Sequence, residues 1–112
     1  MKSILLTTCL TFLFGCTAIE VLAPPVDELF ITEAKLSAAQ TAELKQGREI
    51  YLNFCTECHR ARQVDDISPR NWKRHIPKMF KKAELYPEEI KLLTAYLKTA
   101  GPINQRLIEK RQ

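Results

Sequence analysis

The stretch of the 112-residue sequence that decides the fold is Cys55-Thr56-Glu57-Cys58-His59. Two thiols and an imidazole lie close together here, which suits a disulfide, a redox pair, a metal site or attachment of a cofactor. A disulfide between Cys55 and Cys58 would close a small, strained loop, and a redox C-x-x-C motif is expected in a βαβ pattern, which the sequence lacks. A zinc site needs a second pair of ligands, and the only other histidine is His75. Cofactor attachment is therefore the favoured interpretation.

The C-x-x-C-H spacing is the signature of c-type haem attachment, and on these residues the sequence resembles the c-type cytochromes. The chemistry explains the spacing, because two thiols add across two vinyl groups that sit on neighbouring edges of the haem. The resemblance implies that Cys55 and Cys58 hold one covalent haem c. It also implies that His59 is the proximal ligand of the iron.

The N-terminus has the pattern of an export signal. A short positive start precedes an apolar run over residues 4–14, which is shorter than the roughly 20 residues that span a bilayer. The run ends in Leu13-Phe14-Gly15-Cys16, which resembles the lipobox of bacterial lipoproteins. We expect residues 1–15 to be a signal peptide and Cys16 to carry lipid, facing the periplasm; an ordinary signal with an incidental cysteine is the alternative. Thr17, rather than Asp, slightly favours the outer membrane over the inner one.

The rest of the chain divides into three predicted parts. Residues 16–36 contain Pro24-Pro25 and little periodicity, which predicts a lipid-attached tether that is extended near the prolines. Residues 37–101 are the predicted cytochrome c domain, whose small size makes a covalent haem valuable as part of the core. Gly101-Pro102 is expected to end the last helix. Residues 102–112 are then a polar C-terminal tail, although its few apolar side chains could contact a partner.

Two helices are predicted to frame the haem motif. Ser37 and Gln40 fit a capping box, which predicts a helix to about residue 54. One face of it carries Leu44, Gly47, Tyr51 and Phe54. Gly47 costs a helix about 1 kcal/mol relative to alanine. In class I cytochromes c a glycine, an aromatic residue and the first haem cysteine follow each other at intervals of four, as Gly47, Tyr51 and Cys55 do here. The resemblance implies a close crossing with the last helix, and a tolerated surface glycine is the alternative.

The last helix is predicted to begin at Pro87-Glu88-Glu89, where proline and two carboxylates suit a helix N-terminus. Tyr96 and Leu97 resemble the aromatic–aliphatic pair that the class I family packs against the first helix. The predicted fold is therefore all-α, a small class I cytochrome c-like helical domain wrapped around one covalent haem.

The sixth iron ligand is the least determined part of the site. Met79 is the only methionine besides Met1, and it follows Trp72 by seven residues. This spacing, before a short loop and an acidic helix start, is similar to that of small haem domains such as those of quinohaemoprotein amine dehydrogenases. The similarity implies Met79 as the axial ligand. His75, an open iron and a lysine ligand are alternatives, and methionine also fills cores. Pro77 would kink or end a helix, which would leave Met79 on a loop.

Two further residues carry a possible role by resemblance. In the family, a proline in this region accepts the second ring N–H of the haem histidine through its carbonyl, so Pro69 either does this or forms a plain turn. Trp72 either donates its indole N–H to a haem propionate or packs in the core. Nearby arginines would neutralise the haem propionates, and the candidates are Arg60, Arg62, Arg70 and Arg74.

Charge is uneven along the chain. The sequence has 17 basic and 13 acidic residues, a net charge of +4, which is too mild to indicate nucleic-acid binding. Residues 60–82 hold 8 of the basic and 2 of the acidic residues. Around a haem edge, such a rim would steer an acidic redox partner, and a solvated surface is the alternative.

The function expected from these features is electron transfer by a carrier rather than an enzyme. With His59 and Met79 bound to iron, no small-molecule substrate is needed, and no nucleotide or serine-hydrolase motif is present. The carrier would be a shuttle or a subunit of a larger oxidoreductase. The alternative is a gas-binding or peroxide-reacting haem protein with an open or labile sixth site.

Overall fold

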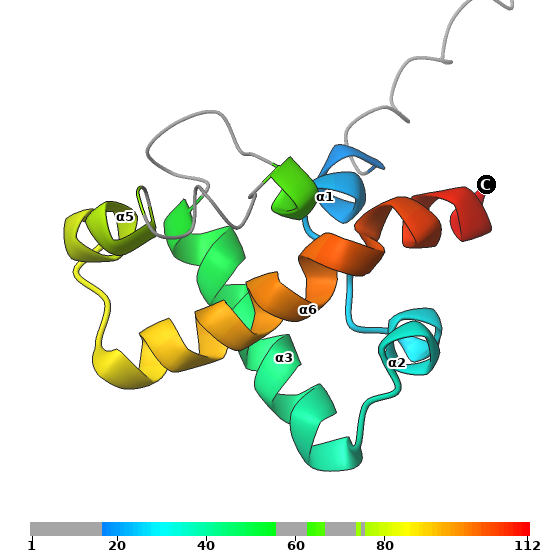
Figure 1. Cartoon of the computed structure of the whole chain (residues 1–112), viewed down its shortest axis with the longest axis horizontal. Helices are drawn as coiled ribbons and strands as arrows, with labels where there is room; N and C mark the ends of the chain where they lie inside the picture. Colours follow the sequence, from blue (N-terminus) through cyan, green and yellow to red (C-terminus); the bar gives the residue numbers. More distant parts are fainter. Residues whose placement is uncertain (1–16, 56–62, 67–73, 75) are drawn as a thin grey trace, which may run out of the picture.

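A computed structural model describes residues 17–55, 63–66, 74 and 76–112 of the chain. These residues form helices and no strand, so the predicted all-α class is confirmed for them (Figure 1). The elements are α1 Thr17–Leu22, α2 Glu28–Ala34, α3 Ala38–Ile50, the π turn η1 Tyr51–Cys55, the 3₁₀ turn η2 Val64–Asp66, α5 Ile76–Lys82 and α6 Pro87–Arg111. In these parts of the chain, no helix is both long and apolar enough to cross a bilayer.

Helices α3 and α6 cross at the centre of the molecule (Figure 1). A Cβ atom on Gly47 would lie 2.2 Å from the carbonyl oxygen of Leu92 and 2.7 Å from the Cβ of Tyr96. No side chain fits at such distances, so a glycine is required for this approach. The close crossing predicted for Gly47 is confirmed, and the alternative of a surface glycine is wrong.

The N-terminal end of α3 has the predicted capping box. The Gln40 N–H donates to the Ser37 hydroxyl at 3.2 Å, and the Ser37 N–H donates to the Gln40 side chain at 2.9 Å. The helix continues beyond Ile50 as η1, whose wider turn rotates the next side chains relative to an α-helix. Phe54 is therefore 39% exposed, instead of sharing the buried face of Tyr51 as expected.

Helix α6 begins at Pro87 as predicted, but it does not end at Gly101-Pro102. It runs to Arg111, so the prediction of a polar C-terminal tail over 102–112 is wrong. Pro102 costs an α-helix about 3 kcal/mol. Ile103 and Leu107, just beyond it, are buried in the core. Complete burial contributes about 1.5–3 kcal/mol for each such side chain, which is enough to offset the proline.

Residues 17–36, which we call the N-terminal arm, are also different from the prediction. They form α1 and α2 with an irregular linker at the prolines, and Ala23, Val26 and Phe30 are buried. The Phe30 ring stacks on that of Tyr96, with centroids 6.3 Å apart. The arm therefore belongs to the core, and the tether predicted for 16–36 is wrong over its described residues.

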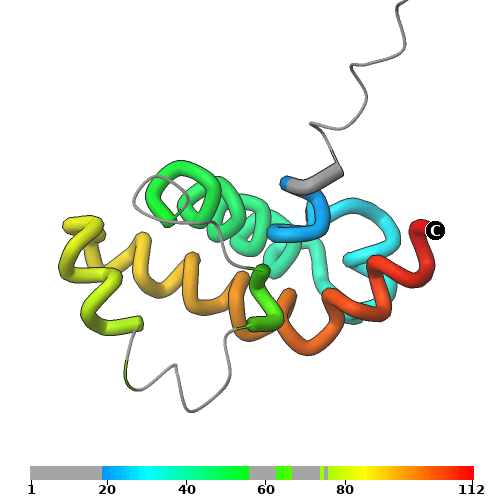
Figure 2. Tube along the Cα trace, turned by 90° about the horizontal axis from the view of Figure 1, so that it is seen from above, coloured from blue at the N-terminus to red at the C-terminus, as the bar shows by residue number. Residues whose placement is uncertain are grey.

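Helix α5 lies at the end of the molecule opposite the C-terminal end of α6 (Figure 2). Pro77 is the second of the residues of α5, Ile76–Lys82, and the helix continues past it. Met79 therefore lies on a helix, and the prediction that Pro77 would leave it on a loop is wrong.

Candidate functional site

Cys55 is the last residue of η1, at the end of the continuous helix that begins with the Ser37 capping box. Its side chain is half-buried and packs against the hydrophobic core. Two turns earlier Gly47 fixes the position of this helix against α6, and one turn earlier Tyr51 is buried, with its ring 6.4 Å from that of Tyr96. The core thus determines the place of the first thiol of the C-x-x-C-H motif.

Met79 is held at the surface by the packing of its helix. Ile76 is buried and Phe80 packs against the core, so one side of α5 is anchored. The Met79 side chain is 42% exposed, which is high for a thioether and unlike a methionine that fills a core. Lys78, Lys81 and Lys82 are exposed on the same helix. Met79 is thus accessible, on a helix that also carries three exposed lysines.

The remaining predicted site residues lie outside the described residues: Cys16, Cys58, His59, Pro69, Trp72 and His75. Their predicted roles stay predictions. Of the arginines proposed for the propionates, Arg74 is described and exposed, whereas Arg60, Arg62 and Arg70 lie outside.

Two of the donors expected to hold a covalent haem, Cys55 and Met79, lie among the described residues. Figures 1 and 2 both show η1, which ends in Cys55, and α5, which carries Met79, at the same end of the molecule. A thiol can form a thioether bond to the macrocycle, and a methionine sulfur is a common axial ligand of haem iron. Within the described ranges no three His, Cys, Asp or Glu side chains gather as for a bare metal ion.

A buried side-chain amide that the sequence analysis missed, that of Asn104, links separate segments of the chain. Asn104 Nδ2 donates to the Val21 carbonyl at 3.0 Å and to Asp65 Oδ1 at 2.9 Å. It therefore joins α1, α6 and η2. Gly101 allows η2 to approach, because a Cβ on it would lie 3.1 Å from the Val64 carbonyl oxygen. These contacts fix the position of η2, which lies between Cys58-His59 and Pro69 in sequence.

A signal for Asn104 was present in the sequence. One stripe of α6 is buried and recurs at intervals of three and four: Leu93, Leu97, Ala100, Asn104 and Leu107. This stripe crosses Pro102 without interruption. The period therefore indicated a continuous helix with a buried amide, although the Gly-Pro pair suggested an end.

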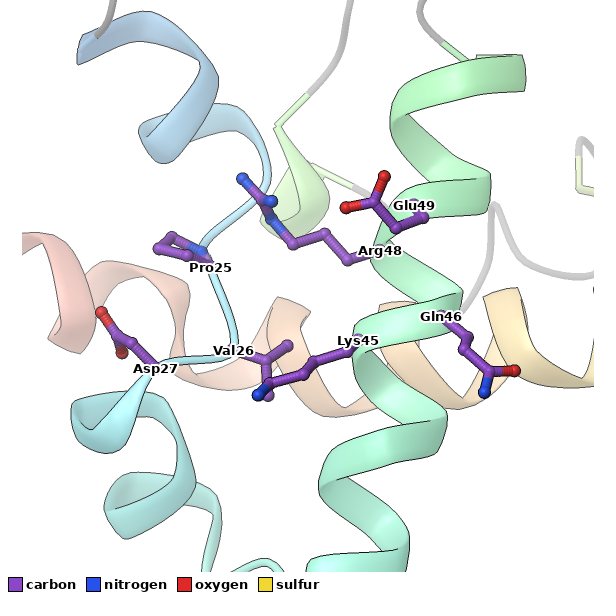
Figure 3. A pocket seen from close by; sticks show the side chains of 7 residues that line it. All are labelled: Pro25, Val26, Asp27, Lys45, Gln46, Arg48 and Glu49. Atoms are coloured by element: carbon purple, nitrogen blue, oxygen red, sulfur yellow. The ribbon is translucent and has the colours of Figure 1, made fainter.

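A depression lies elsewhere, between the linker of the N-terminal arm and α3 (Figure 3). It is lined by Pro25, Val26, Asp27, Lys45, Gln46, Arg48 and Glu49. Arg48 extends from α3 to the linker, where its Nε donates to the Ala23 carbonyl at 3.0 Å. The depression is open to solvent and contains none of the predicted haem-binding residues.

Comparisons with protein-family models, with curated proteins and with solved structures gave no match to this chain.

Proposed function

We propose that the protein is an electron carrier, a lipid-anchored monohaem c-type cytochrome that faces the periplasm and has a class I-like helical domain. The observation that carries the proposal is the motif Cys55-x-x-Cys58-His59, which begins at the end of α3–η1. The close crossing of α3 and α6 at Gly47 supports it independently. The resemblance to class I cytochromes c implies this crossing from the sequence alone.

The chain's own residues have distinct parts in this proposal. When bound, a haem c supplies one iron that takes up and releases a single electron. Cys55 and Cys58 would hold the group through thioether bonds, and His59 and Met79 would supply the protein ligands of its iron. A methionine ligand favours reduced iron and raises the reduction potential relative to a second histidine. The exposure of Met79 supports this role, because its sulfur is not committed to core packing.

The described basic residues support an acidic redox partner. Arg74, Lys78, Lys81 and Lys82 are all exposed on or beside α5, the helix that carries Met79. Exposed charges of one sign around a site accelerate association with a partner of opposite charge, and salt weakens the effect.

The visible spectrum of the exported and matured protein tests the proposal. Sharp low-spin bands, a far-red thioether band in the ferric form and no response of the ferrous form to carbon monoxide are expected. Met79→Ala should become high-spin and bind carbon monoxide, whereas the matched variant His75→Ala should keep the parent spectrum. Carbon monoxide binding by the parent protein would instead favour the gas-binding or peroxide-reacting alternative, and absence of haem would exclude both.

Lipid attachment has its own test. The parent protein should fractionate with membranes and incorporate labelled fatty acid, and Cys16→Ser should do neither. A Cys9→Ser variant is the matched control, since Cys9 lies within the segment that we expect to be removed.

A further inference from the structure

The N-terminal arm is fixed to the rest of the domain by polar contacts, one of them buried and two partly buried, as well as by its apolar side chains. The Tyr96 hydroxyl donates to the Pro24 carbonyl at 2.9 Å, and Arg48 Nε donates to the Ala23 carbonyl. Asn104 Nδ2 donates to the Val21 carbonyl in the last turn of α1. Each of these donors comes from α3 or α6, so the linker after α1 cannot move independently of the central crossing.

Ion pairs hold the second half of the arm. Asp27 caps α2 and accepts two hydrogen bonds of 2.8 Å from Arg111, at the end of α6. Glu33 pairs with Lys110 and with Arg106. Exposed pairs are individually weak. Together with the buried contacts they attach the arm along α6, as both views of the chain show (Figures 1 and 2).

This attachment changes what a lipid on Cys16 would do. α1 begins at Thr17, the residue after Cys16, and Ala23 is already completely buried. The six residues of α1 span about 9 Å. A flexible tether over residues 17–36 would have a root-mean-square length of about 25 Å. A lipid at residue 16 would therefore hold the domain close to the bilayer, with little freedom to turn.

We propose that the N-terminal arm is a rigid stem that seats the face around α1 directly on the lipid surface. The inference rests on the lipid attachment proposed above and goes beyond it, because a lipoprotein could equally extend a domain on a free tether. Ile19 of α1 is 50% exposed, an apolar side chain that lies three residues after the anchor and is available to the headgroup region. The carrier then exchanges electrons at a fixed height and orientation, with a partner in the same membrane.

Neutron reflectometry on a supported bilayer of phosphatidylethanolamine and phosphatidylglycerol measures the height directly. The full lipidated protein is compared with a variant that has about 20 Gly and Ser residues inserted between Cys16 and Thr17, the length of a flexible tether. The parent should form a layer that adjoins the headgroups, and the insertion variant should leave a water-filled gap. A gap of equal thickness in both proteins would overturn the stem.

Hydrogen exchange identifies the face that is seated. Amides of α1 should exchange more slowly in the vesicle-bound protein than in the soluble Cys16→Ser variant. Amides in the first turn of α3, at the opposite edge of the molecule from α1 in Figure 1, should not change. Slower exchange in α3 with no change in α1 would contradict the proposed orientation.

These measurements separate the stem from the proposed function. A protein that lacks haem bands but forms the close layer would refute electron transfer and retain the stem. A haem-loaded protein that does not bind the bilayer would refute the lipid anchor, and with it the stem, while leaving the cytochrome.

Discussion

Substitution of Gly47 by alanine tests how much the close α3–α6 crossing contributes to the free energy of unfolding. The new Cβ would lie 2.2 Å from the Leu92 carbonyl oxygen and 2.9 Å from its carbonyl carbon. Ordinary contact begins at 3.4 Å, so the helices must separate by about 1 Å. The obstructing atoms belong to the backbone, and no rotation of a side chain relieves the clash.

The sign of the effect follows from two opposing magnitudes. Alanine in place of glycine stabilises a helix interior by about 1 kcal/mol. Overpacking a core costs about 1–3 kcal/mol, and here the cost should lie at or beyond the upper end because the whole interface opens. We expect Gly47→Ala to lower the free energy of unfolding by about 2 kcal/mol, although it improves the local helix propensity.

Gly101→Ala is the matched control in the other long helix. Its Cβ would lie 3.1 Å from the Val64 carbonyl oxygen, which requires a shift of only a few tenths of an ångström. The same gain in propensity should offset that strain and leave stability within about 0.5 kcal/mol of the parent. Urea unfolding followed by far-ultraviolet circular dichroism measures both, as a shift of the midpoint at constant slope. A Gly47→Ala protein as stable as the parent would refute the close crossing.

Three further predictions concern the arm and its contacts, and urea unfolding measures each. Tyr96→Phe removes the buried hydrogen bond to Pro24 and should cost about 1 kcal/mol at neutral pH. Desolvation raises the pKa of Tyr96, so the neutral phenol stabilises the fold up to about pH 10, and this stabilisation is lost at higher pH. The phenylalanine variant should therefore lose less stability than the parent between about pH 9 and 11. An equal loss in both proteins would contradict the buried phenol. Desolvation raises the pKa of Asp27, but the Phe30 N–H and Arg111 outweigh it and hold the pKa below its ordinary value. The resulting stabilisation is present above about pH 4 and is lost as the pH falls through the folded-state pKa. Asp27→Asn retains the cap acceptor, so it should make stability depend less on pH in the acid range and should cost under about 1 kcal/mol at pH 7, because the pair with Arg111 is partly exposed. An unchanged dependence of stability on acid pH would count against the Asp27–Arg111 pair. Asn104→Ala should lower stability by about 2 kcal/mol, because it breaks the hydrogen bonds to Val21 and Asp65. The matched control Gln105→Ala changes the exposed neighbouring residue and should cost much less. Equal effects would show that Asn104 does not join α1, α6 and η2.

Local signals in the sequence were sufficient for the central helices. The Ser37–Gln40 box and the Pro87 start each depend on hydrogen bonds or dihedral angles within one turn. The interval between Gly47, Tyr51 and Cys55 predicted a long-range contact only because it matched a known family. Without that resemblance, Gly47 would have indicated a weak helix rather than a crossing.

Two other features that depend on distant residues were predicted wrongly. Pro102 is unfavourable locally, and only the burial of Ile103 and Leu107 shows why α6 continues. The apolar residues of the N-terminal arm follow no regular period and are interrupted by Pro24-Pro25, yet Phe30 is completely buried against Tyr96. The contact of Phe30 with Tyr96 joins residues more than 60 positions apart in the chain, so no window of sequence contains it.

The most direct test of the central claim is the number of haem groups that remain bound to the denatured chain. The protein is expressed with export and c-type maturation, and its mass and haem stain are measured after denaturation, beside a known c-type cytochrome from the same cells. We predict one covalent haem per chain, and no covalent haem when both Cys55 and Cys58 are replaced by serine. An unmodified chain from cells that mature the control cytochrome would contradict the account.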